Sequence, residues 1–208
     1  MTLNDALGKE IVLVVDDFPE NLALLYDALD EAGYTVLVAT DGESALSRAR
    51  LSLPDVILLD AVMPGMDGFE LCKTIKSDVN ISHIPVVLLT ALSDDESSLT
   101  GYKMGADLYL AKPFGVDLLL AATANILRQR LQLRTQFSTT ESEVSIDEIT
   151  YSNADEKFLN KLNDYISEHL SDNELRIDNV ASEMAMSRTT FYNKVKILTG
   201  LTANNYVT

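Results

Sequence analysis

Reactive side chains stand at the ends of several short apolar runs in this sequence. An unbroken apolar run of this kind, rich in Val, Ile and Leu, is typical of a strand that is buried on both faces of a parallel sheet. The polar residues that end these runs are Asp16 with Asp17, Asp60, Thr90 and Lys112. Because the carboxyl ends of the strands in an open α/β sheet line the crevice that binds ligands, we expect these residues to share one site.

The residue types at this expected site suit phosphoryl transfer to a carboxylate. Three aspartates at adjacent strand ends repel one another and need a hard cation, and Mg²⁺ suits them because it binds a few carboxylates and bridges to phosphate oxygens. We predict that Asp60 is the nucleophile that forms an aspartyl phosphate. Lys112 would hold a phosphoryl oxygen as a point charge, and the hydroxyl of Thr90 would donate to the same group.

Simpler interpretations of three residues stay open at this point. Asp17 precedes a predicted helix, and Asp is a favoured N-cap residue. Thr90 could make only a local backbone hydrogen bond at the end of its strand. Tyr109 could be an ordinary half-buried aromatic residue.

Helical periodicity alternates with the apolar runs along the first two thirds of the chain. Strands are predicted over 11–15, 34–39, 56–59, 84–89 and 108–110, and helices over 21–32, 41–50, 68–77, 94–104 and 116–134. This strict alternation predicts an α/β fold with a doubly wound, five-stranded parallel sheet, joined by right-handed crossovers.

The composition narrows the class of protein. The chain has 208 residues, of which 47% are hydrophobic, as expected for one large or two small globular domains. The apolar runs fall short of the ~20 residues that cross a bilayer, and the N-terminus lacks the basic start of a signal peptide, so no membrane partner is expected. A single cysteine, Cys72, fits a reducing cytoplasm, and one cysteine with two histidines argues against a zinc site.

Charge is distributed unevenly. The formal net charge is −16, which argues against nucleic-acid binding if the chain is taken as a whole. From residue 179 onward, however, Glu183 is the only acid, while Arg188, Lys194 and Lys196 are basic. The locally basic part of the chain therefore lies at its C-terminal end.

Residues 1–134 resemble the receiver domain of two-component response regulators, the CheY-like, flavodoxin-like fold. The resemblance rests on residues that occur in the order and spacing of that domain: Asp16-Asp17, Asp60, the 63–68 loop, Thr90-Ala91, Tyr109 and Lys112-Pro113. It implies that a sensor histidine kinase phosphorylates Asp60. The implied Mg²⁺ ligands are Asp16, Asp17, Asp60 and the backbone carbonyl of Val62, and the implied phosphoryl-binding and switch residues are Thr90, Ala91, Lys112 and Tyr109.

The same resemblance implies a homodimer formed through the receiver domain and no enzymatic activity beyond Mg²⁺-dependent self-phosphorylation at Asp60.

Two positions bear on how long the phosphoryl group lasts. Val62 and Leu92, two residues past Asp60 and Thr90, are both apolar, so neither orients a hydrolytic water. We therefore predict a long-lived aspartyl phosphate.

An acidic, hydroxyl-rich segment separates this region from a second one. Residues 138–150 show no sustained periodicity, and we assign 135–152 to a linker. Beyond it, an amphipathic helix is predicted over 155–170, and two short helices over 178–185 and 187–199 are separated by a tight turn. We assign 153–208 to a small all-α domain.

The two short helices are similar to the first helix-turn-helix of the AraC/XylS class of transcription regulators, including its Met-Ser-Arg and Leu-Thr-Gly pieces. Ser187 is the predicted N-cap of the second helix, with Tyr192 among the outward-facing residues. The resemblance implies that Arg188, Thr190 and Asn193 approach base edges and that Lys194 and Lys196 contact phosphates. A basic residue is common in that class where this chain has Asn193. The expected contact of this position with DNA is therefore reduced.

The AraC/XylS class uses two helix-turn-helix units, and this chain stops at Thr208, where the helix that joins them would begin. One basic patch neutralises few phosphates, so we expect weak DNA binding by this chain alone. The chain could be a shortened protein, or the C-terminal part of a hybrid sensor kinase. An alternative of a different class is a receiver whose C-terminal helices act through protein–protein contacts or dimerisation.

Overall fold

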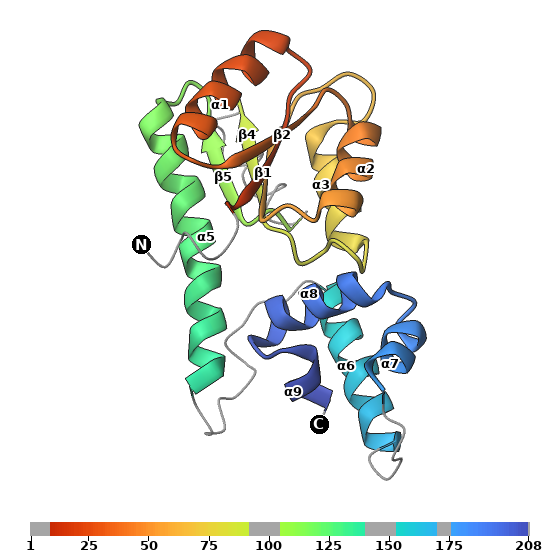
Figure 1. Cartoon of the computed structure of the whole chain (residues 1–208). Helices are drawn as coiled ribbons and strands as arrows, with labels where there is room; N and C mark the ends of the chain where they lie inside the picture. The colour runs from red at the N-terminus through yellow and green to blue at the C-terminus, as the bar shows by residue number, and fades with distance from the viewer. Residues whose placement is uncertain (1–8, 92–104, 140–152, 170–175, 208) are drawn as a thin grey trace. The chain divides into compact units, whose positions relative to one another are not determined.

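The computed structural model describes residues 9–91, 105–139, 153–169 and 176–207, which fold as two compact units (Figure 1). The first unit contains the sheet. Its strands are β1 (Ile11–Val15), β2 (Thr35–Ala39), β3 (Val56–Asp60), β4 (Val86–Thr90) and β5 (Leu108–Ala111). Its helices are α1 (Pro19–Glu31), α2 (Gly42–Ser52), α3 (Gly68–Ser77) and the part of α5 (Val116–Thr139) that ends at Leu127, while the rest of α5 belongs to the second unit.

The sheet has the order β2-β1-β3-β4-β5, and all its pairs are parallel. The chain order reverses between β1 and β3, and that reversal is where such sheets bind ligands. Every residue of β3 and β4 is buried, as the unbroken apolar runs predicted. The predicted five-stranded parallel sheet is confirmed.

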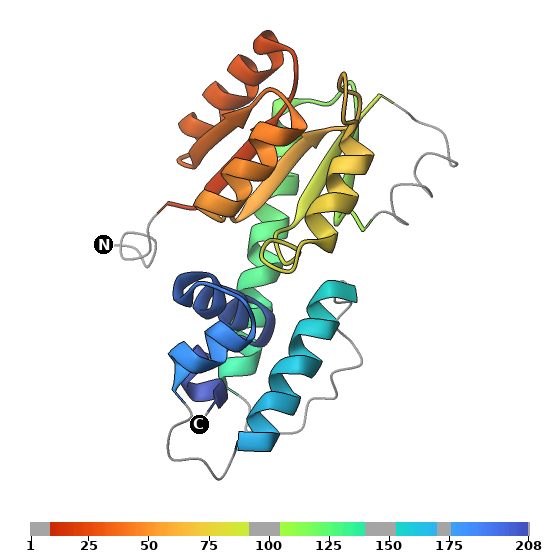
Figure 2. The same cartoon turned by 90° about the vertical axis from the view of Figure 1, so that its right-hand side faces the viewer.

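Helices cover both faces of the sheet. Figures 1 and 2 show α1 and α5 on one face and α2 and α3 on the other. Leu22, Leu25 and Leu29 of α1 and Leu119 of α5 pack in one core cluster with alternate strand residues such as Val14. Because side chains alternate between the two faces of a strand, the strand residues next to these face the layer formed by α2 and α3.

Element ends differ from the prediction in a few places. α1 begins at Pro19, and its N-cap Phe18 makes no side-chain cap, so Asp17 does not cap this helix. α5 runs on to Thr139, beyond residue 134, where we placed the end of the receiver domain. The predicted helix over 94–104 and most of the predicted linker lie outside the described residues. Of the helices that are described, none is both long and apolar enough to cross a membrane.

The second unit is all helical. It contains α6 (Asn153–His169), α7 (Ile177–Glu183), α8 (Arg188–Thr199) and α9 (Ala203–Val207), the last of which the sequence pattern did not predict. One apolar cluster joins these helices through Phe158, Leu162, Val180, Phe191, Val195 and Val207. The hydroxyl of Ser187 accepts a hydrogen bond from the Thr190 N–H and so caps α8, as predicted, and Gly200 ends the helix at a positive φ of 72°.

Cys72 of α3 gives a test of the packing in the first unit. The residue is fully buried, and burial raises the pKa of its thiol to about 11. Since the thiolate is the reactive form, we expect almost no reaction with a disulfide reagent at pH 8 in the native protein and full reaction in denaturant. Rapid labelling of the native protein would show that α3 is packed differently.

Candidate functional site

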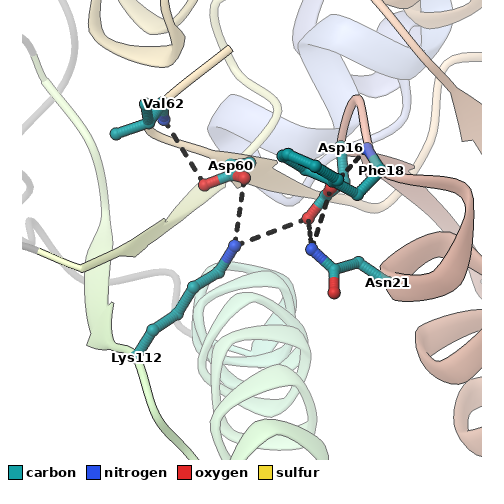
Figure 3. A network of polar contacts seen from close by, with 6 residues as sticks. All are labelled: Asp16, Phe18, Asn21, Asp60, Val62 and Lys112. Carbon is teal, nitrogen blue, oxygen red and sulfur yellow. Dashed lines mark hydrogen bonds and ion pairs between the residues drawn. The ribbon is translucent and has the colours of Figure 1, made fainter.

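Asp60 lies at the C-terminal end of β3, with only 5% of its surface exposed. The Nζ atom of Lys112 is 3.0 Å from its Oδ2, and the N–H of Val62 donates to its Oδ1 over 3.4 Å. Burial raises the pKa of the Asp60 carboxyl, and the neighbouring Asp16 raises it further, while Lys112 opposes both effects. The carboxylate is therefore partly desolvated and lies beside the ammonium group of Lys112 (Figure 3).

Two further carboxylates belong to the same site. Asp16 and Asp17 follow β1, the neighbour of β3, and together with Asp60 they offer oxygen atoms that all lie within 4.8 Å of one another. The Oδ1 atom of Asp17 is buried and accepts no hydrogen bond from any described residue. A buried carboxylate oxygen without a donor is costly unless a cation reaches it, so the donor set fits a hard divalent metal ion.

Asp16 differs from Asp17 because its oxygens are occupied by donors. Its Oδ1 accepts the Phe18 N–H at 2.9 Å, and the amide of Asn21 lies 3.1 Å from Oδ1 and 3.0 Å from Oδ2. Lys112 Nζ lies 3.4 Å from Oδ2 (Figure 3). Asn21 was not among the predicted site residues, because an amide on the first turn of a helix gives no signal in the sequence until the carboxylate that it contacts is known.

The expected phosphoryl-binding and switch residues occupy the neighbouring strand ends. Thr90 is buried at the end of β4, where its carbonyl accepts the N–H of Lys112 at 2.6 Å. Ala91 follows it and is exposed, and Tyr109 is half-buried on β5 beside Leu88. Val62 is 60% exposed above Asp60, whereas Leu92 lies outside the described residues.

The loop after Asp60 closes tightly on the strand that carries it. The N–H of Gly68 donates to the carbonyl of Ala61 at 3.0 Å. A Cβ atom at position 68 would lie 2.1 Å from the Asp60 carbonyl oxygen and 2.7 Å from the Ala61 Cα. Only glycine permits this approach, which explains the Asp-Gly end of the loop.

In the helical unit, the predicted contact residues divide between two faces of α8. Arg188 is exposed, pairs with Asp178 at 3.3 Å and lies 5.5 Å from the ring centroid of Tyr192. Asn193 and Lys196 are also exposed, whereas Thr190 and Tyr192 are half-buried. The hydroxyls of Thr190 and Ser187 lie 2.8 Å apart.

Lys194 differs from our expectation that it contacts phosphates. It is completely buried, and its Nζ lies 2.5 Å from Oδ1 of Asp155 on α6. Residues three and four apart share one face of a helix, so Lys194 lies with Phe191 and Leu198 on the inner face. The assignment of Lys194 as an outward phosphate contact is therefore corrected.

Comparison with known proteins matches the first unit to one family. A family model described as the response regulator receiver domain matches residues 12–124. Response regulator PleD of Caulobacter vibrioides is 44% identical over 120 residues, which are 58% of this chain and 26% of that protein. The crystal structure of a putative response regulator from Chloroflexus aurantiacus is 36% identical with a TM-score of 0.56, covering 58% of this chain and 99% of that one.

One similarity extends across both units. Histidine kinase P4 of Formosa agariphila is 36% identical over 199 residues, which are 96% of this chain but 14% of that protein. The chain thus spans a small part of these two curated relatives.

Proposed function

Because the chain belongs to the response regulator receiver family, we propose that it receives a phosphoryl group on Asp60 from a sensor histidine kinase in the cytoplasm. An Asp60 oxygen attacks the phosphorus atom, the bond from phosphorus to the donor nitrogen breaks, and the donor imidazole leaves as the acyl phosphate forms. The observation that carries this proposal is a buried Asp60 beside two further carboxylates and one lysine.

Asp16, Asp17, Asp60 and the backbone carbonyl of Val62 are the residues that would hold Mg²⁺. When bound, this ion would neutralise charge on the transferring phosphoryl group. Lys112 stabilises the phosphoryl oxygens by its charge, and Thr90 donates its hydroxyl to them. Movement of Thr90 toward the phosphoryl group would open space for Tyr109. These two changes, together with the neighbouring Ala91, would alter the receiver surface that forms the proposed homodimer. We propose no enzymatic activity beyond this self-phosphorylation.

Treatment with acetyl phosphate tests the proposal without the cognate kinase. We expect the intact mass to rise by one phosphoryl group in the presence of Mg²⁺ and to stay unchanged in EDTA. The Asp60→Asn variant should show no increase under either condition. A phosphoryl group on Asp60→Asn, or equal labelling in EDTA, would contradict the proposed acceptor or its metal dependence.

The lifetime of the phosphoryl group gives a second prediction. Val62 is exposed above Asp60 and has no polar group to orient water, so we expect the aspartyl phosphate to last well beyond seconds in Mg²⁺. Replacing Val62 with Asn should shorten it, because an amide can hold an attacking water. Phosphate release after removal of the donor measures both proteins, and decay within seconds in the parent chain would refute the prediction.

We propose DNA binding as the output, through a partial AraC-type helix-turn-helix made by α7 and α8. The observation that favours it is an N-capped α8 with no acidic residue, which exposes Arg188, Asn193 and Lys196. Ser187, Thr190 and Tyr192 remain contact candidates at its first turns. DNA binding by this chain alone should be weak, since few exposed basic side chains are available to contact phosphates.

The competing proposal is that the helices act through protein contacts, as part of a hybrid sensor kinase. Similarity over 199 residues to a histidine kinase supports such a context. A titration of duplex DNA with the chain and with its Lys196→Ala variant distinguishes DNA binding from protein contacts as the output. Weaker, less salt-dependent binding by the variant favours DNA, and the absence of any binding at low salt favours protein contacts.

A further inference from the structure

The side chain of Asn21 contacts Asp16, one of the three carboxylates of the cluster formed with Asp17 and Asp60 (Figure 3). Its Nδ2 atom lies 3.1 Å from Oδ1 and 3.0 Å from Oδ2 of that residue. A donor nearly equidistant from both oxygens restrains the position of the carboxylate and also the rotation of its plane. Asn21 is half-buried on the first turn of α1, so the helix itself holds the amide in place.

The contacts to Asp16 engage both of its carboxylate oxygens. The Phe18 N–H and the Asn21 amide reach Oδ1, and the Asn21 amide and Lys112 Nζ reach Oδ2. Asp17, by contrast, has a buried oxygen with no donor among the described residues. The donors around Asp16 therefore hold its buried carboxylate in place, while the Asp17 oxygen without a donor stays available to a cation.

The amide of Asn21 carries no charge, and for the charge of the cluster this matters as much as its geometry. Lys112 pairs with Asp16 and Asp60, and the three carboxylates of the cluster together with this lysine carry a formal charge of −2, which matches a divalent cation. A lysine or arginine in place of Asn21 would also satisfy Asp16, but it would reduce that charge and compete with the metal ion. The amide of Asn21 donates to Asp16 without this cost.

We propose that Asn21 is a positioning residue of the phosphoryl site: its neutral amide orients the Asp16 carboxylate by hydrogen bonding, so that the cluster keeps its shape for a divalent cation without gaining a positive charge. This inference rests on the proposed function, because it concerns the metal site on which that function depends. Partners of metal-site residues typically change metal affinity by about 10- to 100-fold when removed.

Binding of Mn²⁺ to the unphosphorylated full chain tests the inference, with water-proton relaxation as the readout. We expect Asn21→Ala to weaken binding by about 10- to 100-fold. Asn21→Lys, which keeps a donor but adds a positive charge, should also bind more weakly. Glu20→Ala is the matched control, because Glu20 is the exposed neighbour on the same helix turn; its screened charge should alter affinity by no more than about twofold.

A second readout needs no metal. The Phe18 N–H donates to the same Asp16 carboxylate, so its hydrogen exchange should accelerate in metal-free Asn21→Ala and stay unchanged in Glu20→Ala. Equal Mn²⁺ affinity and equal Phe18 exchange in Asn21→Ala and the parent chain would overturn the role of Asn21 alone. Failure of the parent chain to bind Mn²⁺ would instead overturn the proposed metal-dependent function.

Discussion

Replacing Lys112 with alanine is expected to slow phosphorylation of Asp60 by about 10²- to 10³-fold, the usual cost of removing one donor that stabilises transition-state charge. Lys112 Nζ lies 3.0 Å from Asp60 and 3.4 Å from Asp16, so its removal takes away the cation that faces the incoming phosphoryl group. It also removes the partner that opposes the rise in the pKa of the Asp60 carboxyl.

Initial rates with saturating acetyl phosphate and Mg²⁺ measure this effect. Lys73→Ala is the matched control, because Lys73 is an exposed lysine of α3 in the same unit, and its rate should equal that of the parent chain. Lys112→Arg should recover part of the activity, since it restores the charge with a different shape. A Lys112→Ala rate within a few-fold of the parent rate would remove Lys112 from the phosphoryl site.

Replacing Lys194 with alanine is expected to destabilise the helical unit by about 3–5 kcal/mol, because the buried Asp155 carboxylate loses its cation and keeps the hydroxyl of Ser82 as a neutral donor at 2.7 Å. Both side chains are almost completely buried, and their ion pair joins α6 to α8. Exchange of the α8 amides, followed by mass spectrometry, reports the opening of this unit separately from that of the sheet.

Two variants make this second prediction specific to the ion pair. Lys196→Ala removes an exposed lysine from the same helix and should change stability by less than about 0.5 kcal/mol. The double variant Asp155→Leu with Lys194→Met replaces both charges with apolar groups and should lie near the parent stability. Equal α8 exchange in Lys194→Ala and Lys196→Ala would show that the buried pair does not hold α8.

The sheet and most of its site were predictable because their signals are local. A fully buried parallel strand is a continuous apolar run, and the candidate site residue is the first polar one after it, as with Asp60 after Leu59 and Thr90 after Leu89. Since parallel strands end at one edge, the approach of Asp16 and Lys112 to Asp60 followed from the topology.

The parts that sequence reasoning missed depend on contacts between distant residues. The sequence alone suggests that Lys194 is an outward-facing basic residue. In the structure it lies on the same face of α8 as Phe191 and pairs with Asp155, which is far away in sequence. Asn21 resembles any polar residue near the start of a helix, because its role comes from the carboxylate it meets across the turn. α9 is a short helix stabilised by the packing of Ala203 and Val207, and five residues carry little periodicity of their own.

Chemical location of the phosphoryl group tests the central claim most directly. Borohydride reduces an aspartyl phosphate to homoserine, so the acetyl phosphate-treated chain can be reduced, digested and sequenced by tandem mass spectrometry. We predict homoserine at position 60, at a yield that follows the extent of phosphorylation and that vanishes in EDTA. Homoserine at Asp16 or Asp17, or a phosphoryl group that resists reduction because it lies on a hydroxyl, would contradict the assignment of Asp60 as the acceptor.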